Sequence, residues 1–300
     1  MIVTITPTPS LDRTAHSDGI THSDDYHQLT DVYIAPAGGG MNISRVLYLA
    51  GQETLAIVPA PDVSQYMRMV GMFGIPCDNI DVPGPIPVHF KVHTPSGQLL
   101  EFRDPPMPLD VAQLTMLRDH AVTHAENASW VVLAGQLPSV ANSAWFVDVM
   151  RAIRLYHPGT KIAVATAGQA LSAVLRQVFT TKPDVIALDA EHISINQDVR
   201  EVVATLIDAE VQHILLCKRR NHFELISGGT SFEATIDSKG TDRLPWIDTA
   251  LAGLLLVDPD HDPAGALRHS LAYANSPLAT QADHAPTPDS LMLNLVRMKA

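Results

Sequence analysis

Two kinds of apolar pattern alternate along the chain. One is a short run that is apolar throughout, and the other places apolar residues three or four positions apart, the spacing of a helix face. The apolar runs lie at 1–6, 54–60, 129–135, 161–168, 184–189 and 213–218. The helix-like segments lie at 41–51, 110–122, 143–156, 170–179, 199–209, from 248 onward and at 266–279. This alternation predicts an α/β fold with a mainly parallel sheet covered by helices on both faces.

Residues 84–105 do not fit a buried parallel sheet. "VHFKVHT" and "QLLEFRD" alternate between apolar and polar residues and are joined by Pro95-Ser96-Gly97, which predicts a hairpin. Residues 13–30 are polar and rich in His and Asp. We expect both segments to form a small β lid, built from about 13–36 and 84–105, on a single domain that spans residues 1–300.

Charge and composition narrow the function. The net charge of −12 argues against nucleic acid or an anionic membrane as the main partner. No apolar run approaches the roughly 20 residues of a membrane-spanning helix, and the first residues lack the pattern of a signal peptide. The 2 cysteines do not make a disulfide scaffold, so we expect a reducing, cytoplasmic location.

Several candidate chemical groups follow the apolar runs, where open parallel sheets bind their ligands. The turn Gly38–Gly40 leads into a helix and could offer N–H groups to an anion. Asp12 and Asn42 could hydrogen-bond hydroxyl groups, and Asp248 could take a proton from one of them. Each group also has a purely structural interpretation, as a tight turn, a turn residue or a helix cap. The 14 histidines are scattered, and no pair shows a convincing zinc spacing.

Four motifs in order resemble one family. They are "MIVTITPTPSLDRT", "AGGGMNISRVLYLAG", "WVVLAGQLP" and "DTALAG". Together they resemble the ribokinase/PfkB family of carbohydrate kinases, in particular its 1-phosphofructokinase and tagatose-6-phosphate kinase branch. The resemblance covers nearly the whole chain. It implies a ribokinase-like, three-layer α/β/α Rossmann-like domain with a β lid, and transfer of phosphate from Mg²⁺-bound ATP to a sugar or sugar phosphate.

The resemblance also implies residue roles. Asp248 would be the catalytic base. Substrate-side positions would be Asp12, Gly38, Gly40, Asn42, Lys91 and Arg103. Nucleotide-side positions would be Lys218, Arg219, Thr249, Ala250, Gly253 and Asn275, and Asp189 would serve the metal. By analogy with the family, the lid would also pair two chains into a homodimer.

The motifs depart from the family pattern mainly on the phosphoryl-transfer side. The Gly-Ala-Gly that would precede the base is Pro245-Trp246-Ile247, and proline has no N–H to donate. A backbone nest from Asp248, Thr249 and Ala250 could replace these donors. Other expected residues are replaced as well: the opening Asn by Thr8, the signature Lys by Gly39, the Thr-Arg pair of the lid by Ile86-Pro87, the Lys-Pro-Asn by Ala187-Leu188-Asp189, and the acid after it by His192.

Two functions therefore remain open from the sequence. The first is an ATP-dependent kinase of a sugar or sugar phosphate that uses Asp248 as base. The second is an impaired kinase homologue that binds a sugar phosphate as a sensor or regulatory protein.

Overall fold

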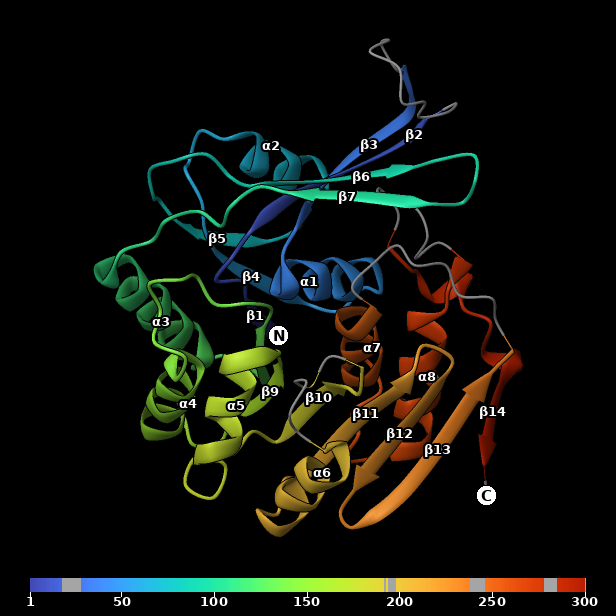
Figure 1. Cartoon of the computed structure of the whole chain (residues 1–300). Coiled ribbons are helices and arrows are strands. Elements are labelled where there is room, and N and C mark those ends of the chain that lie inside the picture. Colours follow the sequence, from blue (N-terminus) through green and yellow to red (C-terminus); the bar gives the residue numbers. More distant parts are fainter. Residues whose placement is uncertain (18–27, 192, 194–197, 238–245, 278–284, 300) are drawn as a thin grey trace.

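A main sheet and a smaller second sheet organise the structure, a computed structural model that describes residues 1–17, 28–191, 193, 198–237, 246–277 and 285–299 (Figure 1). The main sheet has ten strands in the order β14-β13-β12-β11-β10-β9-β8-β1-β4-β5. Its strands are β1 (Ile2–Ile5), β4 (Thr54–Pro59), β5 (Cys77–Ile80), β8 (Trp130–Ala134), β9 (Lys161–Ala165), β10 (Val185–Asp189), β11 (His213–Arg219), β12 (His222–Ser227), β13 (Thr230–Ile236) and β14 (Val296–Lys299).

In the order of the sheet, the seven strands β11-β10-β9-β8-β1-β4-β5 pair in parallel. Strands β12, β13 and β14 pair in antiparallel fashion beyond β11. The parallel part is apolar on both faces, since helices cover both. The main sheet thus follows the alternation seen in the sequence. Strands β12 and β13 form an antiparallel hairpin.

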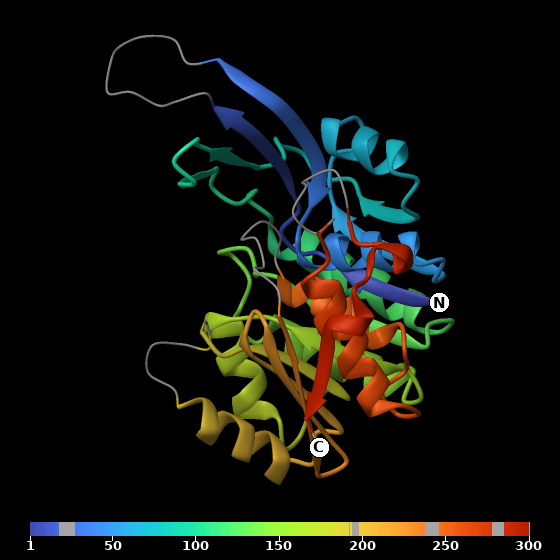
Figure 2. The same ribbon diagram turned by 90° about the vertical axis from the view of Figure 1, so that its right-hand side faces the viewer.

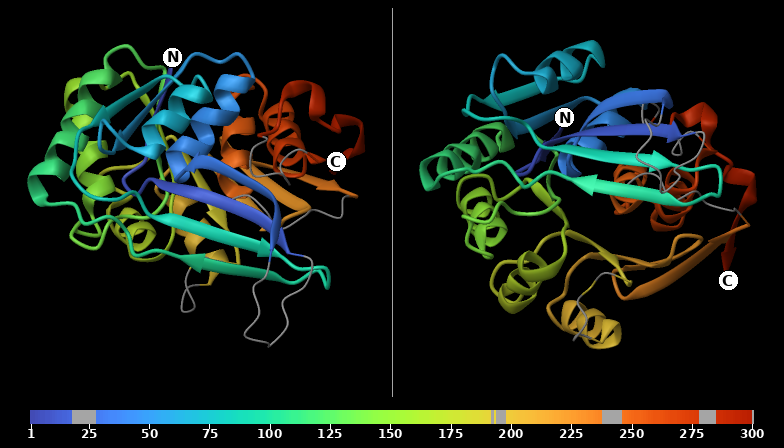
Figure 3. Two further views of the ribbon diagram at one scale, coloured as in Figure 1. Left: turned by 90° about the horizontal axis from the view of Figure 1, so that it is seen from above. Right: turned by 45° about the horizontal axis from the view of Figure 1, so that its top comes forward.

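Helices form the outer layers (Figure 3). On one face, α3 (Val111–Ala125), α4 (Trp145–Tyr156), α5 (Gly168–Gln177) and α6 (Val199–Asp208) contribute to one core cluster, together with α2 (Gln65–Met72). On the other face, α1 (Gly39–Leu49), α7 (Trp246–Leu255) and α8 (Pro263–Ala274) form a second cluster. This confirms the three-layer α/β/α fold. In the described part of the chain, no helix is long and apolar enough to cross a membrane.

The second sheet has four strands in the order β3-β2-β6-β7. They are β2 (Ser10–Ser17), β3 (Leu29–Ala37), β6 (Val88–His93) and β7 (Leu99–Arg103). β6 and β7 pair in antiparallel fashion, whereas β2 and β6 pair in parallel. Figure 2 shows this sheet above the main sheet and not as its continuation. Its strands overlap the ranges from which a lid was expected, although β2 begins at Ser10 and β3 ends at Ala37, outside 13–36. Its action as a lid and as a dimer contact stays a prediction.

Several short elements had no clear signal in the sequence: α2, β5, β14 and the 3-10 turns Pro288–Ser290 and Leu293–Leu295. The short strands carry mixed polar and apolar residues because they lie at the edges of the sheet, where one side is open to solvent.

The glycine turn brings the start of α1 against the ends of two central strands. A Cβ atom at Gly39 would lie 2.5 Å from the backbone nitrogen of Gly135, and one at Gly40 would lie 2.6 Å from the carbonyl oxygen of Ile5. Gly38 adopts φ 115°, which favours glycine. These residues are therefore glycine for packing reasons. The same contact explains why the family's lysine cannot stand at position 39 in this backbone.

We predict that Gly39→Ala lowers the free energy of unfolding by about 1–3 kcal/mol, because the added methyl group overpacks a backbone contact. Urea denaturation would measure the change. Gly71→Ala is the matched control, since Gly71 lies in helix α2 with nothing within 4 Å of the added atom. The control should be neutral or slightly stabilised, because alanine favours a helix. Equal stability of both variants would contradict the packing argument.

Candidate active site

A buried carboxylate lies in the first turn of α7. Asp248 is only 4% exposed, and Asn42 of α1 donates a hydrogen bond from Nδ2 to its Oδ2 at 2.9 Å. The two residues are far apart in sequence. They meet because α1 and α7 pack against each other on the same face of the main sheet. The amide holds one carboxylate oxygen in a fixed orientation.

A second carboxylate, Asp12, lies nearby on β2 of the small sheet. Lys91 Nζ of β6 donates to its Oδ2 at 3.0 Å, and His89 Nδ1 lies 3.5 Å from its Oδ1. Ser10 Oγ is 3.4 Å from Oδ1. Burial by itself would raise the pKa of Asp12, but the hydrogen bond from His89 and the charge of Lys91 together lower it. Asp12 is thus ionised at neutral pH.

The two carboxylates have opposite electrostatic environments. Burial raises the pKa of Asp248 to about 7, the hydrogen bond from Asn42 opposes the rise, and the negative charge of Asp12 adds to it. A carboxylate whose pKa is near neutral can take and return a proton at physiological pH. Asp12 remains charged and can only accept hydrogen bonds.

The structure thus brings Asp12, Asn42, Lys91 and Asp248 together, with Gly38 and Gly40 at the start of the helix that carries Asn42. The sequence analysis missed His89. A signal for it was present, because alternation along "VHFKVHT" puts His89, Lys91 and His93 on one face of the strand.

Arg103 does not join this group. It is 58% exposed on β7, and its guanidinium donates to Glu101 Oε1 at 3.0 and 2.8 Å. Its side chain is held along the strand by its neighbour and not by Asp12. Sequence position alone could not separate Arg103 from Lys91, because both lie on neighbouring strands of the small sheet.

The beginning of α7 differs from the expected one. The described part of the helix begins at Trp246. The N–H of Ala250 lies four residues after the carbonyl of Trp246, which is the spacing of a helical hydrogen bond. The N–H groups of Trp246, Ile247 and Asp248 have no described carbonyl four residues before them. Ala250 has such a carbonyl within the described helix, whereas the donor role expected of Asp248 stays a prediction. Pro245 lies outside the described residues.

Trp246 packs against the core and not into open space. Its ring centroid is 5.8 Å from that of Phe223 on β12, and it is half-buried. Tryptophan in this position covers the β12 side of the helix start with an apolar ring. It also lies one residue from Ile247, which is packed on the same core cluster.

The expected nucleotide-side residues are distributed among structural contacts. Lys218 Nζ binds Glu224 at 2.8 Å and Glu233 at 3.2 Å, while Arg219 is exposed. Asn275 caps α8 and donates to the carbonyl of Arg220 at 2.8 Å, so it ties α8 to the β11–β12 turn.

Gly253 and Thr249 are both buried in α7. A Cβ at Gly253 would lie 2.8 Å from Tyr273 Cδ2, so this glycine allows α7 and α8 to pack closely. Its position is inside a helix–helix contact and not at a surface where a nucleotide could reach it.

Asp189 ends β10 and is half-buried, and its Oδ1 accepts the N–H of Glu191 at 3.0 Å. A carboxylate at the carboxyl end of a strand fits Mg²⁺, which commonly takes one or two protein carboxylates and completes its shell with phosphates and water. The residue that stands for the second family acid, His192, lies outside the described residues.

The larger cavity is remote from these residues. A groove of about 980 Å³ lies near the amino ends of β9, β10 and β11, and its lining includes Arg151, Arg154 and Lys182. A smaller cavity of about 350 Å³ lies between the small sheet and α2. Its lining includes Leu11, next to Asp12, and Ile86, which stands where the Thr-Arg pair of the family pattern has Thr.

The raised pKa of Asp248 predicts a pH dependence of stability. The unfolded chain ionises this group near 4, whereas the folded chain keeps its proton up to about pH 7. Its contribution to the free energy of unfolding is therefore present at low pH, falls as the pH rises, and levels off above about 7. The free energy of unfolding of Asp248→Asn, measured by urea denaturation, should rise by about 1–3 kcal/mol relative to that of the wild type between pH 5 and pH 8.

Glu224→Gln is the control for this comparison. Burial raises the pKa of Glu224, but hydrogen bonds from Lys218 and Ser231 outweigh that effect and lower it. Glu224 is then ionised in both states across the same interval, so its variant should keep a constant difference from the wild type. A constant difference for Asp248→Asn as well would show that Asp248 ionises normally in the folded protein.

Comparison with known proteins finds relatives by sequence and by fold. No family model matches the chain. The ATP-dependent 6-phosphofructokinase isozyme 2 of Mycobacterium tuberculosis is 27% identical over 262 residues, which cover 84% of this chain and 73% of that protein. The isozyme 2 enzyme of Escherichia coli is 24% identical over 216 residues, 69% of each chain.

Solved structures show the same fold. Phosphofructokinase-2 from Escherichia coli superposes with a TM-score of 0.84 at 17% identity and covers 96% of both chains. A Thermotoga maritima protein described as a possible 1-phosphofructokinase gives a TM-score of 0.85 at 14% identity over 100% of this chain and 99% of its own. By sequence the chain is similar to ATP-dependent 6-phosphofructokinases of the PfkB type, and it shares the ribokinase-like fold of the solved phosphofructokinases.

Proposed function

We propose that the protein transfers phosphate from ATP to a hydroxyl group of a sugar phosphate, with Asp248 as the general base. The observation that carries this proposal is the state of Asp248: buried, held by Asn42, and with a pKa near 7. A helix cap needs neither burial nor a perturbed pKa, whereas a base near neutral pH benefits from both.

The neighbouring groups fit a sugar. Asp12 is ionised and accepts hydrogen bonds, which suits the hydroxyl groups of a carbohydrate. Lys91 and His89 fix its orientation from β6, and Lys91 adds a positive charge that suits a phosphorylated substrate. A hydroxyl that bridges Asp12 and Asp248 would have its proton directed to Asp248, the carboxylate with the higher pKa.

The N–H groups of Trp246, Ile247 and Asp248, in the first described turn of α7, would lie toward the positive end of the helix dipole. They would stabilise negative charge on the phosphate during transfer. Mg²⁺, when bound, would neutralise further phosphate charge, and Asp189 would be one of its protein ligands. The relatives named above are ATP-dependent phosphofructokinases, which supports ATP as donor and a hexose phosphate as acceptor for this chain.

A second function is favoured by Trp246. Its indole ring packs on Phe223 at the start of α7, where the family pattern has a small residue. If this ring prevents a nucleotide phosphate from reaching the N–H groups, the protein would bind a sugar phosphate through Asp12 and Lys91 without transferring phosphate. It would then act as a sensor or regulatory protein.

Turnover with Asp248 intact and replaced tests the proposed base. With Mg²⁺, ATP and fructose 6-phosphate, fructose 1-phosphate or tagatose 6-phosphate, the wild type should release ADP. Asp248→Asn should lower that rate at least about 100-fold, because proton transfer is lost. A coupled ADP assay would measure the rate, and calorimetry would show that the variant still binds the sugar phosphate.

Calorimetric titration with Mg²⁺-ATP separates the two functions. Binding of a sugar phosphate without ATP binding and without turnover would exclude the kinase and leave the sensor. Turnover that persists in Asp248→Asn would remove the role of Asp248 while keeping the kinase.

Substitution of Lys91 and of Arg103 tests which cation of the small sheet contributes to substrate binding. Lys91→Met should weaken sugar-phosphate binding about 10-fold or more, because it removes the charged partner of Asp12. Arg103→Met, on the neighbouring strand, is the matched control and should have little effect, since Arg103 is held by Glu101. Calorimetry on both variants would measure the change. An equal loss in both would show that Arg103 turns toward the substrate after all.

A further inference from the structure

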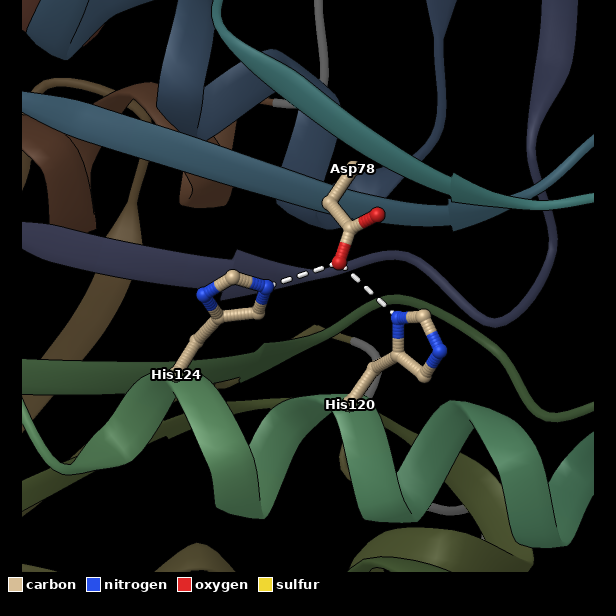
Figure 4. A group of neighbouring side chains, drawn as sticks. All are labelled: Asp78, His120 and His124. Atoms are coloured by element: carbon tan, nitrogen blue, oxygen red, sulfur yellow. Dashed lines mark hydrogen bonds and ion pairs between the residues drawn. The ribbon is translucent and has the colours of Figure 1, made fainter.

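Three potential metal ligands meet on the face of the main sheet opposite α7. Asp78 lies in the edge strand β5, and His120 and His124 lie on α3. Figure 4 shows both imidazole rings directed at one oxygen of the carboxylate. The expectation that no histidine pair has a metal-binding spacing was wrong, because "HAVTH" places these two one turn apart on a helix.

The three side chains converge. His120 Nδ1 lies 2.8 Å and His124 Nε2 lies 2.7 Å from Asp78 Oδ2, and the ligand atoms are all within 4.8 Å of one another. Bonds of about 2.0–2.2 Å from Zn²⁺ to nitrogen and oxygen in a tetrahedron separate ligand atoms by about 3.4 Å. The carboxylate would need to move back from the rings by less than about 1 Å to admit an ion.

The site has rigid support and is open to solvent. α3 is a 15-residue helix that starts with a capping box at Asp110 and Gln113, so the two histidines hold a fixed spacing. β5 is hydrogen-bonded to β4 in the main sheet. The three side chains are 31–37% exposed, which leaves an ion a path and leaves room for water as a further ligand.

The ligand types select the ion. Two imidazole nitrogens and one carboxylate suit Zn²⁺ and similar transition ions, whereas Mg²⁺ and Ca²⁺ prefer oxygen ligands alone. A hydrogen-bonded cluster of the carboxylate and the two imidazole rings is the alternative, with no ion bound.

We propose that Asp78, His120 and His124 form a site for a divalent transition-metal ion, for which Zn²⁺ is the best match, with one position left to water. The bound ion would tie α3 to the edge strand β5. The site is separate from Asp248, since α3 and α7 cover opposite faces of the main sheet. Its effect is on stability and not on the transfer of phosphate.

The test is a titration of EDTA-treated, full-length protein with Zn²⁺ against a chromophoric competitor. We expect one ion bound with a dissociation constant in the micromolar range or below, and a thermal midpoint raised by a few degrees at saturation. His124→Gln and Asp78→Asn should each weaken binding at least about 10-fold. Co²⁺ bound in place of Zn²⁺ should give visible absorption bands that these variants lose.

Two controls keep the result specific. His261→Gln removes an exposed histidine that lies 3.1 Å from Asp258, a single His–Asp pair without a second imidazole, and it should bind Zn²⁺ like the wild type. Mg²⁺ at the same concentration should leave the thermal midpoint unchanged. Circular dichroism would show that each variant is folded, and His120→Gln gives an independent removal of a ligand. Equal Zn²⁺ affinity in wild type, His124→Gln and Asp78→Asn, or no binding at 0.1 mM in the wild type, would overturn the proposal.

Discussion

The hydrogen bond from Asn42 to Asp248 is the interaction on which the candidate site depends. It joins α1 to α7, two helices separated by most of the chain, and it fixes one oxygen of a carboxylate that is otherwise removed from water. The bond is available only because the start of α1 lies directly on the ends of β1 and β8. Glycine at positions 39 and 40 permits that approach, since a side chain at either position would collide with backbone atoms.

The contrast between the two carboxylates follows from this packing. Asp248 is enclosed by two helices and meets a neutral amide, so its charged form is poorly stabilised. Asp12 lies on the small sheet, where Lys91 supplies a positive charge within hydrogen-bonding distance. One group therefore exchanges a proton near neutral pH while the other remains an anion. Two acids with separated pKa values are a common arrangement for acid–base chemistry.

Three adjacent departures from the family pattern, Pro245, Trp246 and Ile247, directly precede Asp248. The apolar residues Trp246 and Ile247 pack on the second core cluster and belong to the first helical turn. The backbone N–H groups of that turn are still directed along the helix axis, as in any helix start. What differs is the bulk around them. The raised pKa of Asp248 depends on burial and on Asn42, whereas access of a nucleotide phosphate to this turn would depend on that bulk.

The sequence by itself determined the fold class, because burial on both faces of a parallel sheet leaves continuous apolar runs and each covering helix leaves an apolar stripe. It also determined that Asp248 lies at a helix start and that a glycine turn leads into α1. These signals are local, and each can be read within a few turns of chain. The edge strands β5 and β14 were not predicted, because each has only one buried residue and therefore a weak apolar pattern.

Only the tertiary structure decided which side chains meet. Lys91 reaches Asp12 whereas Arg103 turns to Glu101, and Asp78 comes to lie over a histidine pair on α3. The packing of Trp246 of α7 on Phe223 of β12 likewise joins two segments that are separate in the sequence. The pKa values of these groups depend on burial and on nearby charges. Contacts between distant segments set both, so no single stretch of sequence encodes them.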